Sequence, residues 1–132
     1  MPVAIADSSV WARLSQPRVG ALLGDAIEAN ALAITEPLML ELLRSARATE
    51  DFDRLAWMYS SLHRAPMSEA VTARARWTQG ELVKRGLHRG PSVVDLLSAA
   101  AAELTGCELW HCDKHFDHIA AATGQPVRRV GR

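Results

Sequence analysis

The 132-residue sequence has no long hydrophobic run, although 48% of its residues are hydrophobic. A membrane-spanning helix needs about 18 or more consecutive apolar residues, and no segment approaches that length. Residues 1–9 reach Asp7 before any long apolar stretch and do not resemble a secretory signal. We therefore expect a cytoplasmic protein without a membrane span, with enough apolar residues for one hydrophobic core.

Cysteine is scarce, with only Cys107 and Cys112 in the chain. Small secreted domains that depend on disulfides carry more cysteines at a denser spacing. A disulfide between these two is conceivable, but free cysteine is usually a buried residue. We expect two reduced, mostly buried thiols.

The chain has no excess of either charge, since 15 basic residues balance 15 acidic ones. A protein that coats nucleic acid is usually clearly basic, so the balance argues against that class. Lysine is rare, however, and 13 of the basic residues are arginine, whose planar guanidinium matches phosphate oxygens. Phosphate recognition and the codon usage of a GC-rich genome both explain this bias.

Repeats, low-complexity tracts and long linkers are also absent, so we expect one domain over residues 1–132. Short apolar runs predict strands at 3–6, 31–34, 64–67, 108–111 and 126–130. Helical patterns predict helices at 10–14, 19–30, 36–48, 51–62, 69–85, 91–103 and 114–123. Strands that alternate with helices indicate an α/β fold with a mainly parallel sheet.

Five acidic residues occupy related places in this pattern. Asp7 and Asp113 follow predicted strands, and Glu41, Asp95 and Asp117 lie near the starts of predicted helices. Because ligand crevices form at the carboxyl ends of parallel strands, these carboxylates can converge there. Clustered carboxylates repel one another, and Mg²⁺ or Mn²⁺ relieves that repulsion. Two such ions about 3.5–4 Å apart can hold the attacking and leaving oxygens of a phosphodiester.

Each acid also has a purely structural interpretation. Asp7 can cap the following helix, and Ser92 with Asp95 fits a capping box. Glu41 can pair with Arg44 three residues later. Asp113 and Asp117 can be a turn residue and a surface helical acid.

A zinc site is the nearest chemical alternative. His111, Asp113, His115 and His118 lie within eight residues, and histidine is a common zinc ligand. The H-E-x-x-H pattern is absent, and surface histidines beside a turn explain the same residues. The oxygen-rich set favours a hard cation instead.

Four segments resemble, in order and spacing, the motifs of VapC-type PIN domains, the toxin half of a toxin–antitoxin pair. They are IADSSVW at 5–11, ELLR at 41–44, VDLLSAA at 94–100 and LWHCDKHFD at 109–117. The resemblance covers essentially the whole chain. One departure is His111, where the fourth motif often has threonine or serine, which puts a supporting hydroxyl in doubt. The resemblance implies a three-layer α/β/α PIN-like domain.

The same resemblance implies roles for the matched residues. The metal, Mg²⁺ or Mn²⁺, would be held by Asp7, Glu41, Asp95 and Asp113, with Asp117 as a supporting or second-metal ligand and Ser9 orienting a carboxylate through its hydroxyl. The reaction would be endonucleolytic hydrolysis of RNA by a metal-activated water. A VapB-type antitoxin would neutralise the enzyme. The alternative is a non-catalytic PIN-like module that serves as a scaffold.

The tryptophans and Leu40 indicate where other protein chains could bind. Large aromatic residues dominate cores and binding hot spots, so we expect most of Trp11, Trp57, Trp77 and Trp110 inside and one or two at an interface. Leu40 lies opposite the apolar stripe of its predicted helix, which suggests a second buried face. Together with the resemblance, this predicts a homodimer, with the antitoxin covering other apolar surface.

The charge balance predicts how a neutral chain binds RNA. Without the five site acids, 15 basic residues face 10 acidic ones, a net charge of +5. We expect arginines around the acidic pocket to hold flanking phosphates, and the candidates are Arg13, Arg44, Arg85 and Arg89. An antitoxin arginine could reach among the carboxylates by direct pairing.

Overall fold

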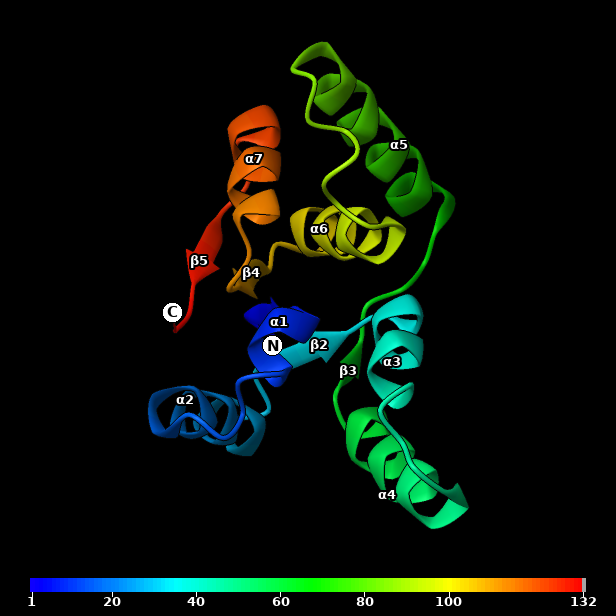
Figure 1. Ribbon diagram of the computed structural model, residues 1–132, viewed down its shortest axis with the longest axis vertical. Coiled ribbons are helices and arrows are strands. Elements are labelled where there is room, and N and C mark those ends of the chain that lie inside the picture. Colours follow the sequence, from blue (N-terminus) through cyan, green and yellow to red (C-terminus); the bar gives the residue numbers. More distant parts are fainter. Residues whose placement is uncertain (132) are drawn as a thin grey trace.

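Figure 1 shows the computed structural model of the chain, which describes residues 1–131. Its strands are β1 (Ala4–Ala6), β2 (Leu32–Ile34), β3 (His63–Arg64), β4 (Glu108–His111) and β5 (Val127–Arg129). They form one parallel sheet in the order β3-β2-β1-β4-β5. Every residue of β1 and β2 is buried, as expected for strands covered on both faces.

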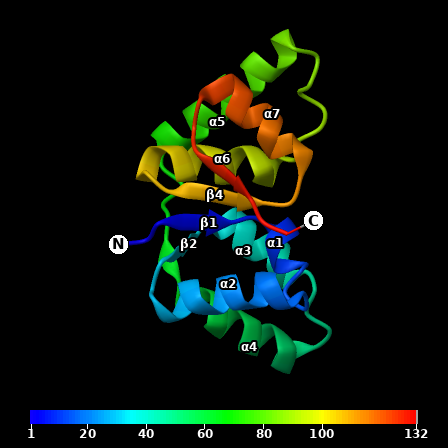
Figure 2. The same cartoon turned by 90° about the vertical axis from the view of Figure 1, so that its left-hand side faces the viewer.

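The helices are α1 (Ser8–Trp11), α2 (Pro17–Glu28), α3 (Glu36–Leu43), α4 (Thr49–Ser60), α5 (Glu69–Lys84), α6 (Val93–Thr105) and α7 (Lys114–Thr123). In Figures 1 and 2, α2 and α4 lie on one side of the sheet, and α6 and α7 lie on the other. Helix α5 packs outside α6 and α7, and α3 contacts α1, α4 and α6. The predicted α/β/α architecture with a parallel sheet is confirmed.

The core fills the space between the sheet and the helices. Its fully buried large side chains include Ile5, Leu23, Leu38, Leu82, Leu109 and Phe116. Burial of one such side chain stabilises the fold by about 1.5–3 kcal/mol. Each face of the sheet therefore has its own apolar contacts that fix the helices in place.

The tryptophans divide evenly between core and surface. Trp11 and Trp110 are buried, and the Trp11 indole donates a hydrogen bond to the Ala6 carbonyl at 3.1 Å. Trp57 is 78% exposed and Trp77 is also exposed. Leu40 is 63% exposed, so the second buried face predicted for its helix is not covered by this chain.

Most predicted elements have bounds that differ from those in the structure by one to three residues at an end. The strand predicted at 64–67 is β3, two residues long and one residue earlier. The helix predicted at 36–48 ends at Leu43, after which Arg44, Ser45 and Ala46 donate to carbonyls three residues back. Such bonds tighten the last turn of a helix. The apolar period continues through Ala46, so periodicity alone could not locate this end.

The local signals at helix starts are confirmed. The Thr35 hydroxyl accepts a hydrogen bond from the Leu38 N–H at 3.2 Å and caps α3.

Both cysteines are free, and Cys107 is buried. Among residues 1–131, no helix combines the length and the apolar character that crossing a membrane requires.

Candidate active site

Three of the five acids, Asp7, Asp95 and Asp113, lie on elements that meet where β1 and β4 end. These strands pair in parallel, with Ala6 beside Trp110, and the Asp7 N–H donates to the Trp110 carbonyl at 2.9 Å. Figure 2 shows α1 and the starts of α6 and α7 at the end of the sheet where β1 and β4 terminate. The topology thus brings the elements that carry Asp7, Asp95 and Asp113 to one edge, as predicted for the carboxyl ends of parallel strands.

Asp7 is the most deeply buried of the five acids, with 2% of its surface exposed. Its Oδ2 accepts a hydrogen bond from the Ser9 N–H at 2.9 Å, so it caps α1. Its Oδ1 is buried and has no hydrogen-bond partner among residues 1–131. Because burying an unpaired polar atom is costly, capping explains only one of the two carboxylate oxygens.

Asp95 combines the predicted capping box with an unfavourable environment for charge. Ser92 Oγ accepts from the Asp95 N–H at 3.0 Å, and Asp95 Oδ2 accepts from the Ser92 N–H at 2.9 Å. Burial raises the pKa of Asp95, the Ser92 N–H opposes that rise, and the negative charges of Asp7 and Asp113 add to it. The three aspartates therefore act on one another electrostatically.

Glu41 lies on α3, the helix that contacts α1 and α6. Its side chain is half-buried, and Oε2 is buried without a hydrogen-bond partner. Glu41 does not form the predicted surface ion pair with Arg44 among the described residues, so that structural role does not account for its carboxylate. Glu41 and Asp7 thus each have one buried carboxylate oxygen without a hydrogen-bond partner among the described residues.

Asp113 and Asp117 both belong to the start of α7 but differ in their partners. Asp113 caps the helix, with Oδ1 accepting from the His115 N–H at 3.0 Å. Asp117 is exposed and forms an ion pair with Arg129 of β5 at 2.6 Å. The Asp117 carboxylate is therefore already paired with the Arg129 guanidinium.

His111 is fully buried at the end of β4. Its Nδ1 accepts a hydrogen bond from the Asp113 N–H at 3.2 Å, and its ring packs 5.4 Å from that of Phe116. Burial lowers the pKa of His111, which keeps the ring neutral and able to accept this bond. The sequence did not show that His111 positions Asp113, because only the packed strand end reveals it.

Ser9 contacts the site in a different way from the one expected. Its backbone N–H reaches Asp7, whereas its hydroxyl accepts a hydrogen bond from the Cys112 N–H at 2.9 Å. Ser9 therefore ties α1 to the loop between β4 and Asp113. This bond fixes the two acids that follow neighbouring strands.

The donor set fits a hard divalent cation. Within residues 1–131, no three Asp, Glu, His or Cys side chains are close enough together to make a finished metal site, so an ion would have to draw the carboxylates inward. The unsatisfied oxygens of Asp7 and Glu41 and the mutual repulsion at Asp95 are what such an ion would relieve. The finding of no finished metal site applies to the histidines as well, and the only hydrogen bond of His111 Nδ1 among residues 1–131 is the one from the Asp113 N–H.

The four arginines predicted at the rim occupy separate places. The Arg13 side chain donates a hydrogen bond to the Ser9 carbonyl, four residues earlier, at 2.7 Å. Arg44 is exposed at the end of α3. Arg85 and Arg89 are exposed in the connection between α5 and α6, which leads to Ser92 and Asp95. Their contact with RNA stays a prediction.

Residues 4–122 match the PIN domain family. The chain belongs to this family. The match spans β1 to α7 and includes all five acids. The PIN domain is 39% identical to ribonuclease VapC18 of Mycobacterium tuberculosis, over 94% of this chain and 92% of VapC18. It is 38% identical to ribonuclease VapC2 of the same species, over 94% of this chain and 89% of VapC2.

Solved structures agree on the fold. The PIN domain is similar to a chain of VapBC2 from Rickettsia felis, bound to a DNA fragment from its promoter, with a TM-score of 0.77 at 16% identity. That superposition covers 98% of this chain and 99% of the other.

Proposed function

We propose that this PIN domain, acting as one unit over residues 1–132, is a metal-dependent endoribonuclease toxin that hydrolyses RNA phosphodiester bonds. Asp7, Glu41, Asp95 and Asp113 would hold Mg²⁺ or Mn²⁺, with Asp117 in a supporting place. The observations that carry the proposal are the buried carboxylate oxygens of Asp7 and Glu41, which have no hydrogen-bond partner among residues 1–131, and an Asp95 whose pKa is raised by burial and by the charge of Asp7. The relatives named VapC ribonucleases support the RNA substrate.

The chain's own residues would fix the geometry of the reaction. Mg²⁺ or Mn²⁺, when bound, supplies an activated water and stabilises negative charge on the phosphate oxygens. The backbone N–H groups of Ser9 and Ser92 each bind one carboxylate oxygen, of Asp7 and of Asp95 respectively, so the second oxygen of each carboxylate would be available to a metal. His111 holds the Asp113 backbone. Preorganised ligands of this kind need little rearrangement during the reaction.

The proposal includes a VapB-type antitoxin and a cytoplasmic setting. Structural neighbours include toxin–antitoxin complexes. A cluster of carboxylates in need of a cation would also attract an antitoxin arginine, whose guanidinium forms charge-assisted hydrogen bonds with carboxylates. Such an arginine would inhibit by taking the place of the metal.

A homodimer is a further part of the proposal. Leu40 on α3 and Phe52 and Trp57 on α4 are large, exposed apolar side chains on two helices that pack together, and such groups often mark protein interfaces. Light scattering coupled to gel filtration tests it. We expect a dimer for the wild type and a monomer for Trp57→Ser. A monomeric wild type at micromolar concentration would contradict this part.

Cleavage of a labelled single-stranded RNA tests the enzyme. We expect cleavage with Mg²⁺ or Mn²⁺, none with EDTA, and none for Asp7→Asn. Asp25→Asn is the matched control, because Asp25 is exposed on α2. Metal-independent cleavage, or equal cleavage by Asp7→Asn, would contradict the proposal. A folded wild type that binds partners but cleaves no RNA would instead favour the non-catalytic scaffold.

A further inference from the structure

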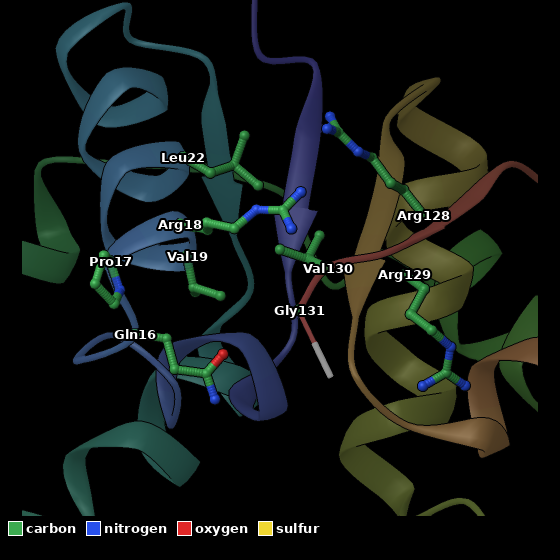
Figure 3. A pocket seen from close by; sticks show the side chains of 9 residues that line it. All are labelled: Gln16, Pro17, Arg18, Val19, Leu22, Arg128, Arg129, Val130 and Gly131. Carbon is green, nitrogen blue, oxygen red and sulfur yellow. The ribbon is translucent and has the colours of Figure 1, made fainter.

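A hollow of about 560 Å³ lies between the start of α2 and the end of β5, and none of the five acids lines it. Figure 3 shows its lining: Gln16, Pro17, Arg18, Val19, Leu22, Arg128, Arg129, Val130 and Gly131. We call this set the α2–β5 groove. A Cβ at Gly131 would come within 3.1 Å of Val19 and 3.3 Å of Gln16. The chain after β5 therefore lies directly on α2, and the groove is formed by segments more than 100 residues apart.

The groove carries three cations and no acid in its lining. In Figure 3, Arg18 from α2 and Arg128 from β5 extend into the space between the two elements. Neither has an ion-pair partner among residues 1–131. The Arg128 guanidinium lies 5.5 Å from the centre of the Trp110 ring, which limits its orientations. Unneutralised arginines in a concave surface concentrate anions.

The groove adjoins the carboxylate site through its third arginine. Arg129 points away from Arg18 and Arg128 in Figure 3 and pairs with Asp117 in the first turn of α7. Asp113 caps that same helix, and Asp117 Oδ1 lies 3.5 Å from Nε2 of His111, which holds Asp113. A chain of direct contacts therefore leads from the groove to the proposed metal ligands.

We propose that the α2–β5 groove binds the RNA backbone beside the cleaved bond, with Arg18 and Arg128 holding its phosphates. The inference rests on the proposed function. A polyanion fits because the lining offers cations without competing carboxylates, and guanidinium groups bind phosphate in bidentate fashion. Val19, Leu22 and Val130 add an apolar floor on which a base or ribose can pack. An acidic protein segment is the other occupant that this chemistry would accept.

RNA affinity at two salt concentrations tests the proposal. The probe is a fluorescent single-stranded RNA, titrated with Asp7→Asn protein so that it stays intact. Adding Arg18→Gln and Arg128→Gln together should raise the Kd roughly tenfold at low salt. The slope of log Kd against log salt concentration should fall by about 0.7 for each phosphate that an arginine no longer neutralises. Arg47→Gln with Arg76→Gln is the matched control, since both arginines are exposed elsewhere. Arg128→Lys should keep much of the affinity because it keeps the charge.

Cleavage kinetics separate this inference from the proposed function. For the groove variant we expect a higher KM with a nearly unchanged kcat, because its substitutions lie outside the carboxylate site. Wild-type protein that neither binds nor cleaves RNA would overturn the function. Wild-type protein that cleaves RNA, while the groove variant matches the control in Kd, salt slope and KM, would overturn only the groove. Loss of antitoxin binding with unchanged RNA affinity would also overturn it, and would assign the groove to a protein segment.

Discussion

The two charged regions of this PIN domain differ in how their charge is balanced. At the ends of β1 and β4, Asp7 and Asp95 are buried, with 2% and 9% of their surfaces exposed, and they repel each other. In the α2–β5 groove, Arg18 and Arg128 are exposed and have no ion-pair partner among residues 1–131. Water can stabilise the exposed arginines, whereas the buried carboxylates have lost most of their hydration. A net charge of zero therefore conceals one acidic region, proposed to bind metal, and one basic region, proposed to bind phosphate.

The largest effect is expected for Asp95→Asn. The substitution removes one charge from the proposed metal site while asparagine keeps an oxygen for the capping box. Loss of a residue that merely supports a metal ligand costs about 10–100-fold in activity or affinity, so loss of a ligand itself should reduce kcat by more than about 100-fold. The rate of RNA cleavage measures this. Asp53→Asn, exposed on α4, should cleave like wild type, and equal rates for both variants would remove Asp95 from the site.

A smaller effect is expected for Gly90→Ala. A Cβ at Gly90 would lie 2.5 Å from His115 Nδ1, so His115 or the loop before Ser92 must move. Small misplacements of catalytic groups are costly, and we expect cleavage to fall roughly tenfold. Gly80→Ala is the matched control, because nothing lies within 4 Å of its Cβ position. It should leave cleavage unchanged and stabilise α5 by about 0.5–1 kcal/mol. Identical cleavage by the two variants would contradict the expectation that the loop before Ser92 positions Asp95.

Asp117→Asn should affect cleavage less, by under about tenfold, because Arg129 rather than a metal is the partner that Asp117 has in the structure. The exposed ion pair contributes only about 0–1 kcal/mol. Its loss frees Arg129, so RNA should bind slightly more tightly at low salt. Fluorescence anisotropy with the intact RNA measures this affinity. A loss of activity as large as that of Asp95→Asn would instead make Asp117 a metal ligand.

The smallest effect concerns stability without metal. Burial raises the pKa of Asp95, so the folded state binds its proton more readily than the unfolded state does. The free energy of unfolding therefore falls as pH rises from the usual aspartate range through this raised pKa, and ionised Asp95 destabilises the fold at neutral pH. In EDTA at pH 7, Asp95→Asn should raise the Tm by a few degrees, corresponding to about 1 kcal/mol. The gain should shrink near pH 4, and a lower Tm at pH 7 would contradict this reasoning.

Local sequence signals predicted the fold and the elements that carry Asp7, Asp95 and Asp113. The Ser92–Asp95 capping box, the Thr35 cap and the apolar runs of β1 and β4 depend on neighbouring residues, so they are readable from the sequence. The parallel sheet then places Asp7 and Asp113 together. The end of α3 depends on a tightened last turn, which periodicity does not report.

Contacts between distant segments could not be predicted. The groove joins Arg18 to Arg128, and Asp117 pairs with Arg129 across the turn into β5. The arginine pair at 128 and 129 was a visible signal, but only tertiary packing shows that it faces α2. His111 likewise depends on packing, since its bond to the Asp113 N–H requires a buried ring.

Calorimetric titration of metal-free protein with Mn²⁺ tests the central claim most directly, because it needs neither RNA nor antitoxin. We expect saturable binding of one or two ions per chain by the wild type and by Asp25→Asn, with strongly weakened binding by Asp7→Asn and Asp95→Asn. Folded wild-type protein that binds no Mn²⁺, or variants that bind it as tightly as the wild type, would contradict the assignment of these carboxylates as a metal site.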